Sequence, residues 1–148
     1  MNYFDEYYLG AFRKFATFSG RARRKEYGWF CVFSFIVGLI LGIIDVLVFG
    51  DVDGMFSSIY GLVVFIPSLA LLVRRVHDFG KSGWFVLVMI FAPFISFVIA
   101  GFLGESSLAD LFIIIGLALF IYFIFLPIFK KGDEGENAYG SDPKALNL

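Results

Sequence analysis

Four long apolar stretches dominate this sequence of 148 residues, and all but two of its charged residues lie outside them. The stretches cover residues 27–49, 55–73, 84–103 and 108–129. Each holds 19 to 23 residues, and an α-helix that crosses a hydrocarbon core of about 30 Å needs about 20. Composition agrees, because 59% of the residues are hydrophobic and 17% are charged. We therefore expect an all-α membrane protein with four transmembrane helices in a single domain.

The basic residues predict how these helices are oriented. All 12 Lys and Arg residues lie before the first stretch, between the second and third, or after the fourth. The other two connections, 50–54 and 104–107, contain no basic residue. Short loops follow the positive-inside rule, so both termini and the middle loop are predicted to be cytoplasmic. We expect anionic lipid headgroups as partners at that face, with no nucleic acid and no cofactor.

Acidic residues alone occupy the predicted outer side and its margin: Asp45, Asp51, Asp53, Glu105 and Asp110. Asp45 lies near the outer end of the first stretch. One interpretation makes it an ion or proton site inside the membrane. The other makes it an interfacial carboxylate that caps or pairs at the end of the helix bundle, and this is the interpretation we favour.

Segments on either side of the four stretches have distinct patterns. Aromatic residues recur every three or four positions before the first stretch: Phe4, Tyr8, Phe12, Phe15 and Phe18. Residues 1–19 are therefore expected to form an amphipathic helix. That helix lies in the membrane interface, or its aromatic face packs on the protein's own helices. Residues 130–148 form a polar, Gly-rich tail, and its acidic residues are candidates to pair with the basic segments.

Small residues mark one face of the first stretch. Ser34, Gly38 and Gly42 recur every four residues, and Gly38 with Gly42 forms a G-x-x-x-G pair. Such a pair permits close backbone approach of another helix. We expect this face to pack against a helix, and it is a candidate interface for a homo-oligomer.

The middle connection, Arg74 to Trp84, is the densest polar segment and holds the only histidine, His77. Gly80-Lys81-Ser82 resembles the end of a phosphate-binding loop, but Arg75 stands where that motif requires Gly. No second histidine is present, so we expect no metal site. Three interpretations stay open: a loop that sets topology, an anionic-lipid site, or a catalytic site that uses His77 and Asp78. The candidate anion ligands are Arg21, Arg23, Arg24, Arg74, Arg75 and Lys81.

Three segments carry a resemblance to a known family. They are Phe18–Tyr27 (FSGRARRKEY), Arg74–Trp84 (RRVHDFGKSGW) and Gly135–Pro143 (GENAYGSDP). In this order they resemble the signatures of a bacterial inner-membrane family catalogued as domain of unknown function 805. Phe85 and Ala138 depart from its frequent Trp and Arg. The resemblance implies a multi-pass inner-membrane protein and supplies no reaction.

Three functional hypotheses follow from these observations. The leading one is a non-enzymatic membrane module whose basic cytoplasmic face binds anionic lipid or a phosphorylated partner. The first alternative is a small oligomeric transporter or channel, with Asp45, Pro67 and Pro93 along a path. The second alternative is an enzyme at the membrane interface that acts on a lipid phosphate through His77 and Asp78.

Overall fold

The computed structural model describes residues 2–50 and 54–145, so Asp51 and Asp53 lie outside the described residues. Four helices in it are long and apolar enough to cross a membrane. They are α2 (Arg24–Phe49), α3 (Met55–Asp78), α4 (Phe85–Leu103) and α5 (Ser107–Phe129). Two short elements precede them, the π-helical turn η1 (Phe4–Leu9) and α1 (Gly10–Arg13). The expected four-helix membrane fold is confirmed.

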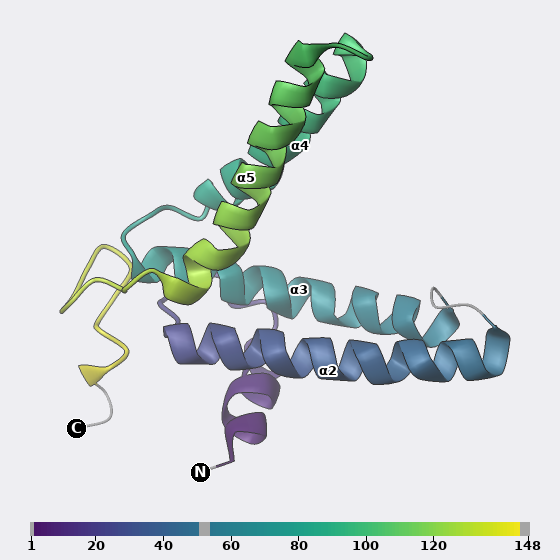
Figure 1. Cartoon of the computed structure of the whole chain (residues 1–148). Coiled ribbons are helices and arrows are strands. Elements are labelled where there is room, and N and C mark those ends of the chain that lie inside the picture. The colour runs from purple at the N-terminus through teal and green to yellow at the C-terminus, as the bar shows by residue number, and fades with distance from the viewer. Residues whose placement is uncertain (1, 51–53, 146–148) are drawn as a thin grey trace.

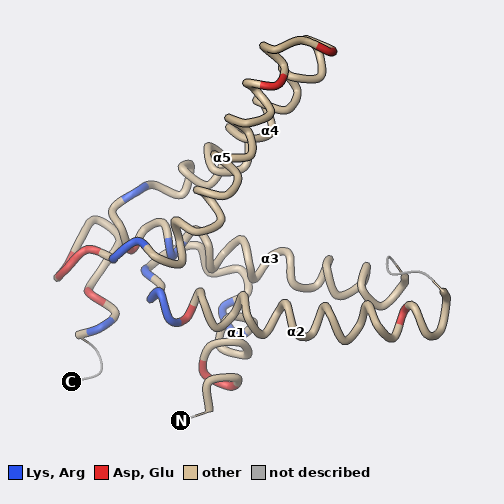
Figure 2. The backbone as a smooth tube through the Cα atoms, viewed as in Figure 1, with Lys and Arg blue, Asp and Glu red and all other residues tan. Residues whose placement is uncertain are grey.

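The four long helices form two hairpins that diverge from a common end (Figure 1). In one hairpin α2 packs along α3, and in the other α4 packs along α5. The end where α2 begins, α3 and α5 finish, and α4 starts is called the basic end here. Lys and Arg gather there, whereas acidic residues mark the far ends of both hairpins (Figure 2). The tail returns to the basic end, so the chain's polar segments meet in one place.

Two helix ends differ from the expected boundaries. The first apolar stretch begins at residue 27, but α2 already begins at Arg24. The second stretch finishes at residue 73, but α3 continues to Asp78. A hydropathy pattern places the end of a span at the first charged residue. An α-helix continues as long as its backbone N–H and C=O groups are hydrogen-bonded. Consequently Arg74, Arg75, His77 and Asp78 lie on the last turns of a helix rather than in a loop.

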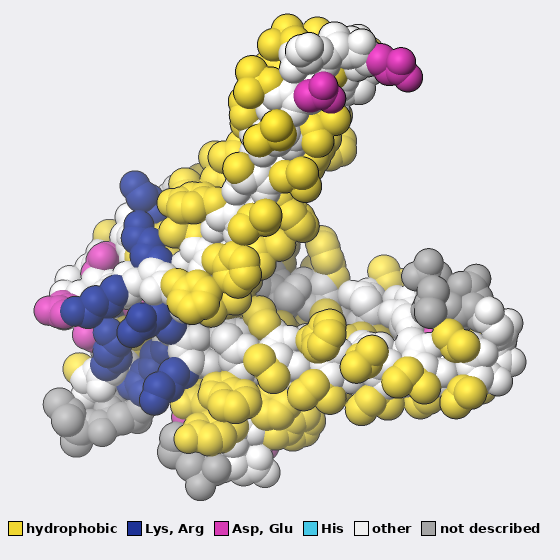
Figure 3. Space-filling view, viewed as in Figure 1, with side chains coloured by type: hydrophobic (Ala, Val, Ile, Leu, Met, Phe, Trp, Pro, Cys, Tyr) yellow, Lys and Arg dark blue, Asp and Glu magenta, His cyan; other side chains and the backbone are white. Residues whose placement is uncertain are grey.

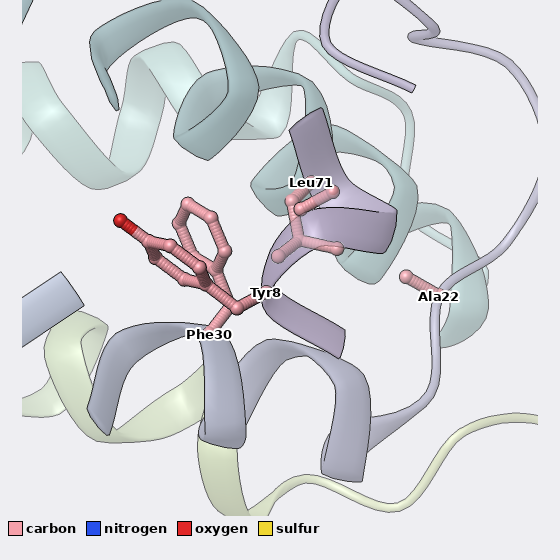
Figure 4. Packing of buried hydrophobic residues seen from close by; sticks show 5 residues of the cluster. Tyr8, Ala22, Phe30 and Leu71 are labelled. Atoms are coloured by element: carbon pink, nitrogen blue, oxygen red, sulfur yellow. The ribbon is translucent and has the colours of Figure 1, made fainter. Parts of the chain in front are cut away.

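The N-terminal segment packs on the protein's own helices. Its helical part finishes at Arg13, six residues before the expected end at residue 19. Tyr8 is buried against Phe30 of α2, in a cluster that includes Ala22 and Leu71 (Figure 4). The Tyr8 and Tyr60 hydroxyls are 3.0 Å apart, which ties this segment to α3. This is the second of the two alternatives considered for the aromatic face.

Candidate functional site at the basic end

A carboxylate between two guanidinium groups forms the centre of the basic end. Asp78 Oδ1 accepts a hydrogen bond from Arg21 Nε at 3.0 Å. Asp78 Oδ2 accepts one from Arg75 Nη1, one turn earlier on α3. The side chains of Arg21, Asp78 and Arg75 are 1%, 4% and 0% exposed. A buried charge is tolerated only when it is paired and hydrogen-bonded, so each member of this triad depends on the others.

Arginine side chains also bond the carbonyl groups at the end of α5. The last carbonyl groups of a helix have no partner within it, and basic side chains near that end can bond them. Arg75 Nε donates to the Pro127 carbonyl at 2.7 Å, and its Nη2 donates to the Lys130 carbonyl. Arg24 Nη1 lies 3.4 Å from the Phe129 carbonyl. Arg75 therefore joins α3 to α5 as well as holding Asp78.

The C-terminal tail docks on the basic end through its backbone. Arg21 donates to the carbonyl groups of Asp133 and Gly135, both at 2.6 Å, and of Gly140 at 3.2 Å. Arg23 donates to the Pro143 carbonyl. The expected pairing through tail carboxylates takes another form, because Glu134 pairs with Lys131 in the tail itself. The hydrogen bond and charge of Lys131 lower the pKa of Glu134. Tail docking thus depends on backbone geometry more than on tail charge.

His77 lies beneath this docked tail. Its Nδ1 is 3.2 Å from the Gly20 carbonyl oxygen. The Tyr139 ring stacks on the imidazole, and Asn137 Nδ2 donates to the His77 carbonyl at 3.0 Å. The histidine is 8% exposed. His77 and Asp78 therefore contact different groups, and both candidate catalytic residues are covered by the protein's own chain.

Arg74 occupies a second buried position on α3. Its Nη1 donates to Glu26 at 3.2 Å, and the Arg74 carbonyl accepts from the Ala22 amide at 3.0 Å. The arginine side chain is 3% exposed. Its Nε and Nη2 have no hydrogen-bond partner among the described residues. The ion pair between Arg74 and Glu26 joins the end of α3 to the first turn of α2.

Of the six candidate anion ligands, the structure places two at the surface. Arg24 and Lys81 are exposed, Arg23 is half-buried, and Arg21, Arg74 and Arg75 are buried in the internal contacts described above. Further exposed bases flank the helix ends: Lys25 at the start of α2, and Lys130 and Lys131 after α5. Basic side chains gather where the hairpins meet (Figure 3). We call Arg24, Lys25, Lys81, Lys130 and Lys131 the basic collar.

Asp45 lies at the opposite end of the α2–α3 hairpin, where it caps α3. Its carboxylate accepts from the amide of Phe56 at 3.1 Å and from the amide and hydroxyl of Ser57 at 2.7 and 2.6 Å. Gly54 permits this contact, because a Cβ at that position would overlap the Asp45 side chain. A carboxylate at a helix N-terminus satisfies amide groups that lack a partner and complements the helix dipole. This is the capping interpretation of Asp45.

The small-residue face of α2 packs within the chain. The nearest atoms to a Cβ placed at Gly38 and Gly42 belong to Tyr60 and Ser57 of α3. The Ser34 carbonyl accepts from the Tyr60 hydroxyl at 3.2 Å. The expected helix-packing role thus has a partner in α3, and the homo-oligomer interface stays a prediction.

Sequence reasoning did not single out Glu26, Asn137 or Tyr139. In the sequence Glu26 is a single acidic residue next to a basic run, whereas in the structure its carboxylate accepts a hydrogen bond from Arg74. Asn137 and Tyr139 lie in a polar tail whose composition is typical of a solvent-exposed segment. The third resemblance segment, Gly135–Pro143, contains both tail residues and was the available signal.

Comparison with known proteins agrees with this architecture. The family model described as a protein of unknown function (DUF805) matches residues 15–141. The inner membrane protein YhaI of Escherichia coli K12 is 36% identical over 139 residues, which cover 94% of this chain and 96% of that protein. The inner membrane protein YhaH of the same strain is 31% identical over 142 residues, with 94% and 97% covered. No solved structure matches the chain. The three segments that meet at the basic end lie within or overlap the matched region, and the chain belongs to the DUF805 family of membrane proteins of unknown function.

Proposed function

We propose that this protein is a non-enzymatic inner-membrane module whose basic collar binds anionic lipid headgroups. The observation that carries the proposal is the division of the basic residues into two sets. Arg21, Arg74 and Arg75 are buried, and each is hydrogen-bonded within the protein. The collar residues are exposed beside the ends of apolar helices, where phospholipid headgroups lie.

Interfacial aromatic residues support the same placement. Trp84 follows Lys81 by three positions and is 77% exposed at the start of α4. Indole rings favour the boundary between hydrocarbon and headgroups. A lysine beside such a ring is positioned to meet a lipid phosphate. Near an anionic surface each basic residue contributes about 1 kcal/mol, so the collar would supply several kcal/mol in total.

The alternative functions have less support. A catalytic role for His77 and Asp78 requires access to a substrate, and both side chains are covered. A transport role for Asp45 requires a carboxylate that is available to an ion, but this one already accepts three hydrogen bonds. Neither arrangement favours an enzyme or a channel over the lipid-binding module.

The proposal is tested by replacing collar charges in the full-length protein. Lys25→Gln with Lys81→Gln removes two exposed bases beside helix ends. We expect nanodiscs made from phosphatidylglycerol and phosphatidylcholine to lose their enrichment of phosphatidylglycerol around this variant, as measured by native mass spectrometry. Arg13→Gln with Lys144→Gln is the matched control, because both residues are exposed and lie away from the ends of the four long helices.

The two variants carry the same change in net charge, so long-range attraction alone would affect them equally. Equal phosphatidylglycerol enrichment around the wild-type protein and the collar variant would overturn the proposal. A loss of enrichment in both double variants would also count against it, because the effect would then belong to net charge rather than to the collar.

A further inference from the structure

A polar cavity of about 280 Å³ lies between the N-terminal helices, the basic segment before α2 and the tail. Its walls carry charges of both signs. Lys14, Arg21 and Arg23 are basic, and Glu6 and Glu26 are acidic. Small-molecule sites typically measure about 300–1,000 Å³, so this cavity suits a headgroup rather than a whole lipid.

Three of these five charges are held by contacts within the protein, and two are adaptable. Arg21 is held by Asp78 and by the tail carbonyls, Arg23 donates to the Pro143 carbonyl, and Glu26 is held by Arg74. Lys14 and Glu6 are exposed, so their side chains can adjust to a ligand. Burial and the neighbouring Glu6 carboxylate raise the pKa of Tyr7, which also lines the cavity.

The charge behind the cavity favours a phosphate inside it. Glu26 faces Arg74, whose Nε and Nη2 are buried without a partner among the described residues. The carboxylate of Glu26 therefore balances a positive charge that already lies within the protein. Lys14 and the triad of Arg21, Asp78 and Arg75, in which two guanidinium groups share one carboxylate, give the cavity a positive potential. Glu6 places a single exposed carboxylate at its rim.

Three stacked aromatic rings extend from the cavity wall to α2. Tyr7 in the cavity wall stacks on Tyr3, with ring centroids 5.8 Å apart. Tyr3 in turn stacks on Trp29 of α2 at 5.2 Å. Tryptophan near the end of a span marks the headgroup level of a bilayer. The cavity is thus beside the region in which lipid headgroups reside.

We propose that this cavity binds a phosphoethanolamine group, with its phosphate towards Lys14 and its ammonium towards Glu6. A phosphate accepts charge-assisted hydrogen bonds from Lys and Arg, and a primary ammonium donates three hydrogen bonds. A choline headgroup has no N–H to donate, and a glycerol headgroup has no positive charge. The lining therefore distinguishes three phospholipids that share the same phosphate. This selectivity goes beyond the proposed attraction of the collar to anionic lipid, because phosphatidylethanolamine carries no net charge.

The experiment compares three lipids on the full-length protein in nanodiscs. Native mass spectrometry counts retained phosphatidylethanolamine, phosphatidylcholine and phosphatidylglycerol at matched acyl chains. We expect roughly tenfold preferential retention of phosphatidylethanolamine over phosphatidylcholine, as befits one charge-assisted contact. Glu6→Gln should reduce this preference to below about twofold, and Lys14→Gln should weaken retention at the site of all three phospholipids.

Matched controls come from Glu134 and Lys144, two exposed tail residues that lie outside the cavity lining and outside the collar. Glu134→Gln and Lys144→Gln repeat the same chemical changes and should leave the preference unchanged. Equal retention of phosphatidylethanolamine and phosphatidylcholine by the wild-type protein would overturn the proposal. An equal effect of Glu6→Gln and Glu134→Gln would do the same.

Free O-phosphoethanolamine distinguishes the source of the ligand. Calorimetric binding of it to the detergent-solubilised protein, lost in Glu6→Gln, would support the headgroup site for a soluble ligand. Retention confined to the lipid, with the same dependence on Glu6, would support a lipid ligand. The collar variant Lys25→Gln with Lys81→Gln should keep the preference for phosphatidylethanolamine, so the two proposals can fail separately.

Discussion

The imidazole ring of His77 and the phenol ring of Tyr139 lie parallel, with centroids 3.9 Å apart and planes within 4° of each other. These residues are 62 positions apart in the sequence. The stack places the tail over the end of α3, while Asn137 bonds the carbonyl of the same histidine. The tail is consequently a structural part of the basic end, and its release would uncover His77.

Replacing Tyr139 by Ala should loosen the tail without unfolding the helices. Aromatic pairs contribute about 0.5–1.5 kcal/mol beyond the area that they bury. We expect amides 133–142 to exchange hydrogen roughly two- to tenfold faster in Tyr139→Ala, with unchanged exchange in α4. Tyr139→Phe keeps the ring and should match the wild type. Unchanged tail exchange in Tyr139→Ala would show that the stack does not hold the tail.

Asp78→Asn should destabilise the whole protein, because it leaves Arg21 and Arg75 buried without a counter-charge. Removal of one partner from a buried ion pair costs about 3–5 kcal/mol. Glu134→Gln breaks an exposed ion pair in the tail and should leave the melting temperature almost unchanged. Thermal unfolding of both variants in one detergent measures the difference. Equal melting temperatures would mean that the triad contributes little to stability.

The architecture was largely predictable because its signals are long and repeated. Four apolar stretches of span length fix the helices, and the basic residues mark the end at which the polar segments meet. The helix ends were not predictable in the same way. Whether α3 continues past residue 73 depends on acceptors for Arg74 and Arg75, and these come from Glu26, Pro127 and Asp78.

The candidate site was predictable as a region and not as a set of contacts. A run of arginines indicates an anion site when each is considered as a free charge. Here Arg21 bonds Asp78 and tail carbonyls that are more than 100 residues away in the sequence. Every residue has a backbone carbonyl, so the sequence does not show which carbonyls accept hydrogen bonds from an arginine. The tail was expected to dock through its carboxylates, because acidic residues can be identified in the sequence.

Asp45→Ala should destabilise the α2–α3 hairpin, because the first amides of α3 lose their acceptor. Loss of a helix cap costs about 0.5–2 kcal/mol. Glu105→Ala is the control, since Glu105 is an exposed acidic residue in the connection between α4 and α5. Thermal unfolding should separate the two variants. Unaltered stability of Asp45→Ala, together with an ion flux in liposomes that requires Asp45, would instead favour the transport hypothesis.

Gly132→Ala should displace the tail at its junction with α5. A Cβ at residue 132 would overlap the carboxylate of Asp78, which cannot retreat because Arg21 and Arg75 hold it. Overpacking of this kind typically costs about 1–3 kcal/mol. Gly28→Ala is the matched control, because its Cβ meets nothing within 4 Å on α2 and a helical Ala is favoured over Gly by roughly 0.5–1 kcal/mol. Gly132→Ala should therefore lower the melting temperature and speed hydrogen exchange in the tail. Gly28→Ala should not lower the melting temperature and should leave hydrogen exchange in the tail unchanged. A stable Gly132→Ala protein with a protected tail would show that the contact between the tail junction and Asp78 is not a fixed part of the basic end.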